Sequence, residues 1–542
     1  MGNRTGVTRR SFIGLAGSTA AITAAAAHLN GAHAAEVTTG STALPGSQDF
    51  KIHTPKGTPI AFEAEPVTNI TEEFDVDVAV CGCGIAGIST AASCAENGLN
   101  TIVLEKGSSY AARGGDVAAL GDRVHKAYGI ELDENAFVMD WMTSSSYHAS
   151  EKLVRTFAKR SGEALDWMMD RVGEKNLGEY VITFEDGNMD CSGVTWWASQ
   201  VCFKGWYDVV GKLLEFAESQ GAQVLYETPA VQLVTDDDGA VTGVVAKRAD
   251  GSYVRYNAAK GVVLATGSYD YNPDMLKERI RPRDLVSRLW MNMTSTDTGD
   301  GHLMGIAVGA LEDEYPQPLM LDPSGLSYDN YGPSAGMKPF LRVNAAGERF
   351  FNEYVPTDYI CNAINNEFGA HDFILFDGDT VAALEKMADT SDGTFNTTPE
   401  LRYKEIQEQC ESAETLEELA GLMGVPAENL IATVNRYNAQ CEAGVDEDFH
   451  KPEKYLTPIA TPPFYFQDEG NMVLVTVGGL RIDDQNRVLA KANGLPISGL
   501  YAVGNVSGSM FDNYYPHHIN GVSHGRCLTF GYLTGRRMAG ME

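Results

Sequence analysis

A glycine-rich turn between a predicted strand and a predicted helix limits what this chain can fold into more than any other feature. Residues 75–81 form an apolar strand pattern that leads directly into residues 82–87, Gly-Cys-Gly-Ile-Ala-Gly. Residues 88–97 have a helical pattern, and residues 101–104 are a second apolar strand that ends at Glu105. This order of elements predicts a βαβ unit of a parallel α/β sheet.

Each glycine of the turn has a separate physical role in such a unit. Gly82 allows the tight turn, Gly84 lets the backbone approach a pyrophosphate, and Gly87 lets the helix pack against the strand. The amino end of the helix supplies partial positive charge. Glu105 is placed to accept hydrogen bonds from ribose hydroxyls. The turn is therefore predicted to bind a dinucleotide.

Later strands indicate which dinucleotide is bound. Residues 261–267 are an apolar strand that ends in Ala-Thr-Gly, and residues 499–505 are a similar strand end followed by a helix from about 523 to 538. The sequence has no second glycine-rich βαβ unit for a nicotinamide nucleotide. One dinucleotide fold closed by strands from the far end of the chain is typical of permanently bound FAD. Further strands are expected at 224–226, 231–234, 241–246 and 253–256, with a turn at 236–239.

Length, charge and cysteine spacing exclude several classes of protein. At 542 residues the chain is long enough for two or more domains, or for one large α/β domain with an insertion. With 41 basic and 73 acidic residues, the net charge of −32 would repel phosphate backbones, so nucleic acid is not an expected partner. The nine cysteines include no Cys-x-x-Cys pair, so no metal site is expected.

The amino-terminal residues have the pattern of an export signal. Residues 8–13 read Thr-Arg-Arg-Ser-Phe-Ile, an alanine-rich apolar stretch follows, and residues 32–34 match an A-x-A cleavage pattern. We expect a twin-arginine signal peptide at 1–34 and an N-terminal extension at 35–74, with the mature protein in the periplasm or at the outer face of the cytoplasmic membrane. No later run of about 18 apolar residues occurs, so no integral membrane segment is expected in the mature chain.

Several further motifs follow in order along the chain. They are Gly114-Gly115, Leu-Ala-Thr-Gly at 264–267, Thr-Gly-Asp-Gly at 298–301, Gly-Glu-Arg-Phe-Phe-Asn-Glu at 347–353 and Val-Gly-Gly-Leu at 477–480. With the turn at 82–87, they make residues 75–540 resemble the flavoprotein subunits of fumarate reductase and succinate dehydrogenase, and the 3-ketosteroid dehydrogenases built on the same plan. The resemblance implies an α/β fold: a discontinuous Rossmann-like FAD-binding domain at 75–310 and 470–542, with an inserted α+β capping (substrate) domain at 311–469.

The resemblance also implies how FAD is held. Some relatives attach FAD through a histidine just before the Gly-Gly pair, but residues 108–113 contain no histidine, so the flavin is expected to be noncovalent. The expected cofactor-binding residues are Gly82, Gly84, Ala86, Gly87, Glu105, Lys106, Gly114, Gly115, Ala230, Ala265, Thr266, Gly267, Gly504, Asn505 and Val522.

Three positions differ from the fumarate reductases. Their arginine proton donor stands four residues after the glutamate of the G-x-R-F-x-N-E motif, where this chain has Thr357. The histidine and arginine that hold the substrate carboxylates fall on Val475 and on or near His518. A buried dicarboxylate without paired cations costs several kcal/mol, so fumarate and succinate are not expected substrates.

The C-terminal segment is instead similar to the 3-ketosteroid dehydrogenases, in which a tyrosine at the position of Tyr515 donates a hydrogen bond to the substrate ketone. For their missing tyrosine base we favour Tyr359, with Tyr354 and Asp358 as alternatives. Either His517 or His518 would support Tyr515. The other interpretation is that this loop is a packed turn whose imidazoles cap helix ends or face solvent. The expected catalytic residues are Tyr515, His518, His517, Tyr359 and Asp358.

The predicted chemistry is hydride transfer between flavin and a carbon β to a carbonyl group, with a proton carried by His518, Asp358 or Tyr359. We expect an exported reductase of an activated C=C bond, of enone or enoate type. Because NADH is not available outside the cytoplasm, a separate membrane or periplasmic electron-donor protein is expected as partner, as in anaerobic respiration. One alternative is a 3-ketosteroid-type dehydrogenase that forms a C=C bond next to a ketone. Another is a flavin-containing binding or electron-transfer protein whose cleft is filled by side chains.

Overall fold

The computed structural model describes residues 58–182, 196, 199–286, 288–289, 295–323, 338–387, 398–512 and 514–542. The expected signal peptide at 1–34 and residues 35–57 of the expected N-terminal extension lie outside these ranges. Among the described residues, no helix combines the length and the apolar character needed to cross a bilayer.

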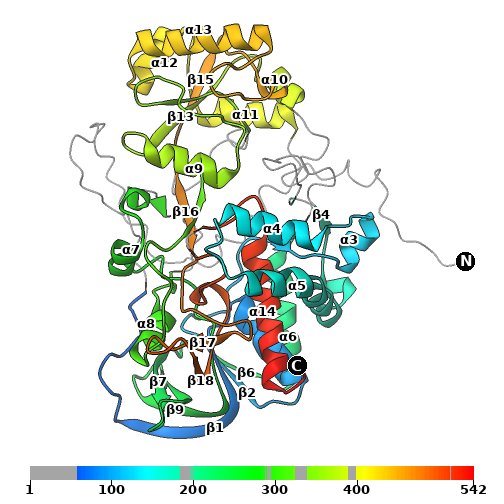
Figure 1. Cartoon of the computed structure of the whole chain (residues 1–542), viewed down its shortest axis with the longest axis vertical. Coiled ribbons are helices and arrows are strands. Elements are labelled where there is room, and N and C mark those ends of the chain that lie inside the picture. The colour runs from blue at the N-terminus through cyan, green and yellow to red at the C-terminus, as the bar shows by residue number, and fades with distance from the viewer. Residues whose placement is uncertain are drawn as a thin grey trace, which may run out of the picture. The chain divides into compact units, whose positions relative to one another are not determined.

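An eight-stranded sheet of the described residues carries the glycine-rich turn (Figure 1). Its strands are β1 (Ile70–Cys81), β2 (Thr101–Leu104), β6 (Gln223–Leu225), β7 (Ala230–Thr235), β8 (Val241–Lys247), β9 (Tyr253–Leu264), β17 (Arg487–Leu489) and β18 (Pro496–Ala502). Parallel strands in the order β18-β9-β1-β2-β6 form its centre, β17 is an antiparallel edge, and β7 and β8 continue from β9 as an antiparallel hairpin. The predicted parallel α/β sheet is therefore present.

The strand β9 differs from the expectation of two separate strands at 253–256 and 261–264. It is one strand of 12 residues, because β1 pairs with it on one side through the intervening segment, with Val76 opposite Ala258. At Gly261, φ is +128° and a Cβ would lie 2.5 Å from the carbonyl oxygen of Gly499. Tertiary pairing thus overrides the weak strand propensity of the alanines and glycine in this segment.

Two helices that are far apart in the sequence lie against each other. They are α2 (Ile85–Glu96) and α14 (Val522–Met538). A Cβ at Gly531 would stand 2.5 Å from the carbonyl oxygen of Ala86, and a Cβ at Gly535 would clash with the next turn of α2 in the same way. Glycines on α14 therefore let the two backbones approach closely, so that α14 covers α2.

Smaller elements surround this core. An antiparallel sheet contains β3 (Asp116–Ala118), β5 (Gln200–Phe203) and β4 (Tyr180–Ile182), and another sheet contains β10 (Arg288–Leu289), β16 (Met472–Thr476) and β11 (Leu319–Asp322). The helices here are α3 (Arg123–Tyr128), α4 (Glu134–Ser144), α5 (Glu151–Val172), α6 (Trp206–Ser219), α7 (Pro273–Arg279) and α8 (Asp300–Ala307). The buried faces of α4, α5 and α6 share one hydrophobic core with the main sheet.

A four-stranded antiparallel sheet with its own helices corresponds to the expected insertion (Figure 1). Its strands, in spatial order, are β12 (Arg342–Asn344), β13 (His371–Phe376), β15 (Phe464–Gly470) and β14 (Glu411–Ala413). Its helices are α9 (Thr357–Asn366), α10 (Thr380–Met387), α11 (Pro399–Gln409), α12 (Leu416–Met423) and α13 (Ala427–Ala443). The apolar side chains around this sheet form hydrophobic clusters that are separate from the core of the main sheet. The domain boundaries at 310 and 469 stay a prediction.

The G-x-R-F-x-N-E motif builds a buried ion network beside this sheet. The Arg349 guanidinium lies 2.8 Å from Glu353 and 2.8 Å from Asp446, and the Lys451 ammonium lies 3.3 Å from Glu353. All four side chains are at most 5% exposed. Burial alone would raise the pKa of Glu353, but Lys451 and Arg349 hold it below its ordinary value. These contacts give the motif a structural role.

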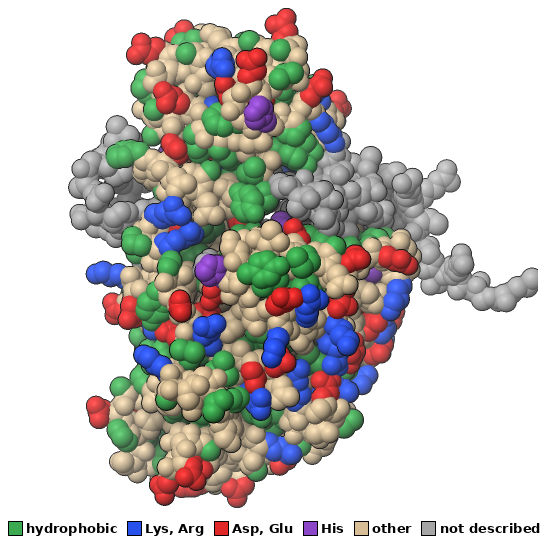
Figure 2. Space-filling model, viewed as in Figure 1, with side chains coloured by type: hydrophobic (Ala, Val, Ile, Leu, Met, Phe, Trp, Pro, Cys, Tyr) green, Lys and Arg blue, Asp and Glu red, His purple; other side chains and the backbone are tan. Residues whose placement is uncertain are grey.

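The described surface mixes charges of both signs. On the face drawn in Figure 2, Lys and Arg side chains alternate with Asp and Glu, and the described residues form no continuous basic surface there.

Arg349→Ala should destabilise the folded chain by about 3–5 kcal/mol, because it leaves two buried carboxylates with one cation. The midpoint of urea unfolding, followed by tryptophan fluorescence, measures the effect. Arg436→Ala removes an exposed ion pair with Asp448 and serves as the control, with a nearly unchanged midpoint. Equal midpoints for the two variants would contradict the network's structural role.

Candidate flavin and substrate site

The glycine-rich turn between β1 and α2 lies against the end of β9. Gly82 has a φ of +110°, and a Cβ there would stand 2.3 Å from the carbonyl oxygen of Ala265. A Cβ at Gly87 would stand 2.0 Å from the carbonyl oxygen of Gly82. Both positions therefore require glycine, for the two reasons that the sequence pattern indicated.

The space beside Gly84 is open, unlike that beside the other two glycines. A Cβ there would meet one atom, the carbonyl oxygen of Ala111, at 4.0 Å. Gly84 precedes the first residue of α2, no side chain caps the helix, and its first turn carries no acidic residue. An accessible backbone at an uncapped helix N-terminus is what a pyrophosphate requires, so the turn fits a dinucleotide.

The Ala-Thr-Gly segment after β9 forms a second side of this site. The amide of Ala265 donates to the carbonyl of Cys81 at 2.8 Å, which fixes the segment beside the turn. The Thr266 hydroxyl is buried and has no hydrogen-bond partner among the described residues, and Gly267 has a φ of +76°. A buried hydroxyl without a protein partner is the kind of group that a bound ligand satisfies.

Glu105 and Lys106 follow β2 and are held by the turn itself. The Glu105 carboxylate accepts hydrogen bonds from the amides of Cys83, at 2.7 Å, and Gly107, at 2.6 Å. Burial raises the pKa of Glu105, while these two amides oppose the shift. The Lys106 ammonium lies 2.8 Å from Asp300 at the start of α8. The ribose-binding role of Glu105 stays a prediction, with its carboxylate already positioned next to Gly84.

The Gly-Gly pair lies against the first turn of α14. A Cβ at Gly114 would stand 2.5 Å from Cε1 of His524, and one at Gly115 would stand 2.8 Å from the carbonyl oxygen of Phe203. The His524 Nδ1–H donates to the carbonyl of Asp116 at 2.9 Å. Burial lowers the pKa of His524 to about 4, so its ring is neutral at pH 7. Sequence reasoning missed His524, because a single histidine in an apolar helix has no recognisable motif.

The strand end at Gly504 meets the same two helices. A Cβ at Gly504 would stand 3.0 Å from Cβ of Ala86, and Val522, the first residue of α14, is fully buried. The Asn505 side-chain oxygen accepts a hydrogen bond from Arg526 at 2.8 Å. Arg526, also missed, is a fully buried cation whose pKa is lowered by burial.

Ala230, the first residue of β7, is buried. Two residues before it, the amide of Thr228 donates to the carbonyl of Glu105 at 2.8 Å, which connects this segment to the end of β2. The structure thus brings the segments expected to hold FAD together around one turn. Their individual contacts with FAD stay predictions.

Tyr515 begins a second group of expected site residues, on the loop before α14. Its side chain is 3% exposed, and its hydroxyl makes no hydrogen bond with a described residue. Burial raises the pKa of Tyr515, opposed by the Ser523 amide and the Arg526 charge. The His517 ring meets the Tyr515 ring edge to face, with centroids 5.7 Å apart, and its Nδ1 also has no hydrogen-bond partner among the described residues. Two buried polar groups are therefore available to a ligand.

His518 is held between two elements. Its Nε2 lies 2.6 Å from the carboxylate of Asp140 on α4, and its Nδ1 lies 3.4 Å from the hydroxyl of Tyr514. The same Asp140 oxygen accepts a hydrogen bond from the Trp196 indole at 2.8 Å. Tyr514 and Asp140 were not predicted from the sequence. The adjacent Tyr-Tyr pair is the one signal that was present for Tyr514.

Helix α9 contributes Asp358 and Tyr359 to the same group. Both carboxylate oxygens of Asp358 are buried without a hydrogen-bond partner among the described residues. Burial raises its pKa, opposed by the nearby Tyr514 hydroxyl and by His518 and His517. Tyr359 also lies close to Tyr514, but its side chain is 41% exposed. The third alternative, Tyr354, stacks on Tyr455 with ring centroids 4.0 Å apart and belongs to the core of the inserted region.

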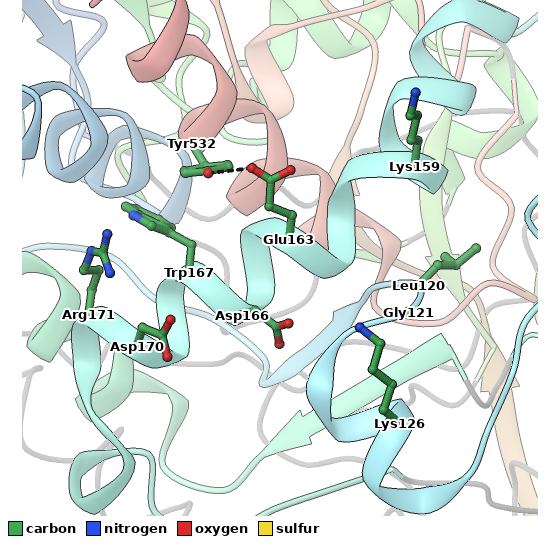
Figure 3. A pocket seen from close by; sticks show the side chains of 10 residues that line it. All are labelled: Leu120, Gly121, Lys126, Lys159, Glu163, Asp166, Trp167, Asp170, Arg171 and Tyr532. Atoms are coloured by element: carbon green, nitrogen blue, oxygen red, sulfur yellow. Dashed lines mark hydrogen bonds between the residues drawn. The ribbon is translucent and has the colours of Figure 1, made fainter. Parts of the chain in front are cut away.

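A polar cleft of about 510 Å³ beside α5 is a separate feature (Figure 3). In it the Tyr532 hydroxyl donates to Glu163 at 2.7 Å, and Asp166 pairs with Arg123 at 3.1 Å. Its lining contains no residue expected to bind FAD or substrate, and we assign it no role. The lining residues are Leu120, Gly121, Lys126, Lys159, Glu163, Asp166, Trp167, Asp170, Arg171 and Tyr532.

Comparison with known proteins agrees with this geometry. Residues 77–522 match the family described as the FAD binding domain. The chain is 28% identical over 494 residues to vinyl phenol reductase from Lactiplantibacillus plantarum, covering 85% of this chain and 94% of that protein. The crystal structure of 3-ketosteroid-Δ4-(5α)-dehydrogenase from Rhodococcus jostii RHA1 matches with a TM-score of 0.68 and 27% identity, covering 87% of this chain and 98% of that one. The open conformation of a flavocytochrome c3 fumarate reductase matches with a TM-score of 0.65 and 25% identity, covering 87% and 79%.

The fold and the turn together define a dinucleotide-binding flavoprotein. The chain belongs to the FAD binding domain family. It is an FAD-dependent oxidoreductase that acts on carbon–carbon bonds, as a C=C reductase or as a dehydrogenase. The predicted α/β FAD-binding fold, the predicted cofactor and the resemblance to fumarate reductases and 3-ketosteroid dehydrogenases are confirmed.

Gly84→Ala should fold like the wild type but bind FAD at least tenfold more weakly, a loss of about 1.4 kcal/mol. The φ of −89° suits an L-residue, and no protein atom stands closer than 4.0 Å to the new methyl group, which therefore points at the cofactor. Thermal unfolding of the apoprotein and the flavin retained after dialysis measure the two effects. Gly87→Ala adds the same methyl group where it clashes, and should lower the apoprotein's thermal stability. Unchanged FAD affinity in Gly84→Ala would contradict the prediction that the backbone at Gly84 contacts FAD.

Proposed function

We propose that this protein is an exported, FAD-dependent reductase of an activated C=C bond of enone or enoate type, with noncovalent FAD and with electrons from a separate redox protein. The observation that carries the proposal is the Tyr515 hydroxyl, which is buried and has no hydrogen-bond partner among the described residues. A buried hydroxyl without a protein partner can donate to a substrate carbonyl oxygen, and so polarise the carbonyl group, without first breaking a protein hydrogen bond.

The surrounding residues suit a reaction at a carbon next to a polarised carbonyl. FAD, when bound, supplies the hydride for the β-carbon. Tyr515 donates to the carbonyl oxygen, and the His517 ring packed at its edge fixes the direction of the phenol. Burial of both side chains excludes water, which strengthens the hydrogen bond to the carbonyl oxygen.

The charges around the loop disfavour a dicarboxylate. Val475 stands where relatives of the fumarate reductase type have a histidine that holds the substrate, Thr357 stands where they have an arginine proton donor, and both are buried. Asp140 and Asp358 instead place carboxylates next to His518. A second substrate carboxylate about 5 Å from either one would cost about 3 kcal/mol at an effective dielectric constant of 20. A substrate with a single carbonyl or carboxyl group avoids this cost.

Export and the electron source are supported by the sequence. Residues 1–34 carry the twin-arginine pattern and an A-x-A cleavage pattern. The sequence has no Cys-x-x-Cys-His haem motif, so electrons from a membrane chain would arrive through another protein. The relative named vinyl phenol reductase supports the reductive direction, and the dehydrogenase relatives supply the competing one.

Purified FAD-loaded protein should reoxidise chemically reduced viologen when given enones, cinnamates, steroid enones or vinyl phenols, and should leave fumarate unreacted. The loss of viologen absorbance under anaerobic conditions measures each rate. Activity with saturated ketones and an artificial electron acceptor, without any reductase activity, would establish the dehydrogenase alternative. If neither assay detects activity, the result would favour a flavin-containing binding or electron-transfer protein.

Tyr515→Phe should lower turnover by about 10²-fold, because the donor to the carbonyl oxygen is lost. Its flavin content should not change, and its thermal stability should stay equal or rise slightly, because the removed hydroxyl has no protein partner. Tyr253→Phe removes a hydroxyl that donates to Glu63 at 2.8 Å and is the matched control, with full activity. Full activity in Tyr515→Phe would remove Tyr515 from the mechanism.

A further inference from the structure

We propose that Tyr514 is the proton donor of this enzyme, that His518 reloads it, and that Asp140 positions His518. The inference rests on the proposed reductase function and names the residue that replaces the arginine donor missing at Thr357. Three side chains from two parts of the chain form a continuous array: Asp140 on α4, and His518 and Tyr514 on the C-terminal loop. Asp358 on α9 lies near Tyr514 and His518.

The geometry of the array is that of a carboxylate, an imidazole and a hydroxyl in sequence. His518 lies between Asp140, at 2.6 Å from Nε2, and the Tyr514 hydroxyl, at 3.4 Å from Nδ1. The Trp196 indole donates to the same Asp140 oxygen and fixes that carboxylate. A carboxylate bonded to one imidazole nitrogen sets the orientation of the ring and stabilises its protonated form, while the other nitrogen faces the hydroxyl.

Tyr514 carries its proton at physiological pH, and it can give that proton only to a strong base, such as the substrate α-carbon after hydride has reached the β-carbon. Burial raises its pKa, and the neighbouring carboxylate of Asp358 raises it further. The groups that face this pair are Asp140 from α4, His517 from the loop, and Asp358 and Tyr359 from α9. Tyr359 is 41% exposed, and Asp358 makes no hydrogen bond to His518. Both therefore fit the donor role less well than Tyr514, which contacts His518.

The proton balance of the step is simple. The Tyr514 O–H bond breaks as a C–H bond forms at the substrate α-carbon, and the phenolate takes a proton from Nδ1 of protonated His518. Nε2–H stays bonded to Asp140, and a solvent proton restores Nδ1. The His518 side chain is 11% exposed, so solvent can reach it. One proton enters for each C=C bond reduced, and Asp140 keeps its charge throughout.

The first test compares FAD-loaded Tyr514→Phe, His518→Ala and Asp140→Asn with wild type in the viologen assay. Tyr514→Phe should lose about 10²-fold or more in turnover with unchanged flavin content. His518→Ala should lose activity that added imidazole restores in proportion to its concentration, which a purely structural role would not allow. Tyr180→Phe, which removes a surface hydroxyl bonded to Glu174, is the control and should keep full activity. Full turnover in Tyr514→Phe, or failure of imidazole rescue, would overturn the proposal.

The second test needs no substrate. Long-range ¹H–¹⁵N spectra of FAD-loaded protein labelled at histidine follow His518, identified by the signal that is missing in His518→Gln. Asp140→Asn should reduce the preference for a proton on Nε2, because that nitrogen faces the Asp140 carboxylate, whereas Tyr180→Phe should leave the preference unchanged. An unchanged preference in Asp140→Asn would overturn the array. A changed preference in Asp140→Asn, together with a wild type that turns over no substrate, would reject the proposed reductase function and support the array.

Discussion

The close approach of the glycine-rich turn to the end of β9 is the constraint on which the rest of the structure depends. Gly82 and Gly87 leave no room for a side chain because Ala265 and Gly82 itself fill that space. Helix α14 then covers α2 through Gly531. The loop of residues 504–521 comes directly before α14, so its tyrosines and histidines are positioned by the same packing that shapes the dinucleotide site.

Buried charge is used in two different ways in this molecule. In the inserted region, Arg349 and Lys451 meet Glu353 and Asp446 in a network whose charges compensate each other. Around the C-terminal loop, Asp358 has no hydrogen-bond partner among the described residues, and His518 contacts Asp140 and Tyr514. The first arrangement stabilises a fold, and the second leaves polar groups able to change protonation state or bind a ligand.

Much of the fold followed from the sequence because the glycine turn, the apolar strands and the C-terminal helix are local patterns. The bounds of β2 agree with the expected residues, and α14 begins one residue earlier than expected. The division of β9 into two strands was wrong because pairing with β1, a long-range contact, decides it. Local patterns carry little information about such pairings.

The site was less predictable than the fold. The expected residues of the C-terminal loop and of α9 do come together. They could be predicted because a resemblance to known enzymes marked both segments. Tyr514, Asp140 and His524 were missed because their positions depend on contacts between distant segments, and none belongs to a motif. A residue without a motif becomes a candidate only when its neighbours in space are known.

The packing of α14 on α2 also has a consequence for how the protein is made. Ser93 on α2 donates to the carbonyl of Tyr532 on α14, 439 residues further along the chain. During synthesis the surface of α2 that packs against α14 stays uncovered until α14 has been made. Contacts of such long range form slowly and leave intermediates prone to aggregation. Assembly of the nucleotide pocket is therefore a late step in folding, and a chain without α14 would lack the helix that covers α2.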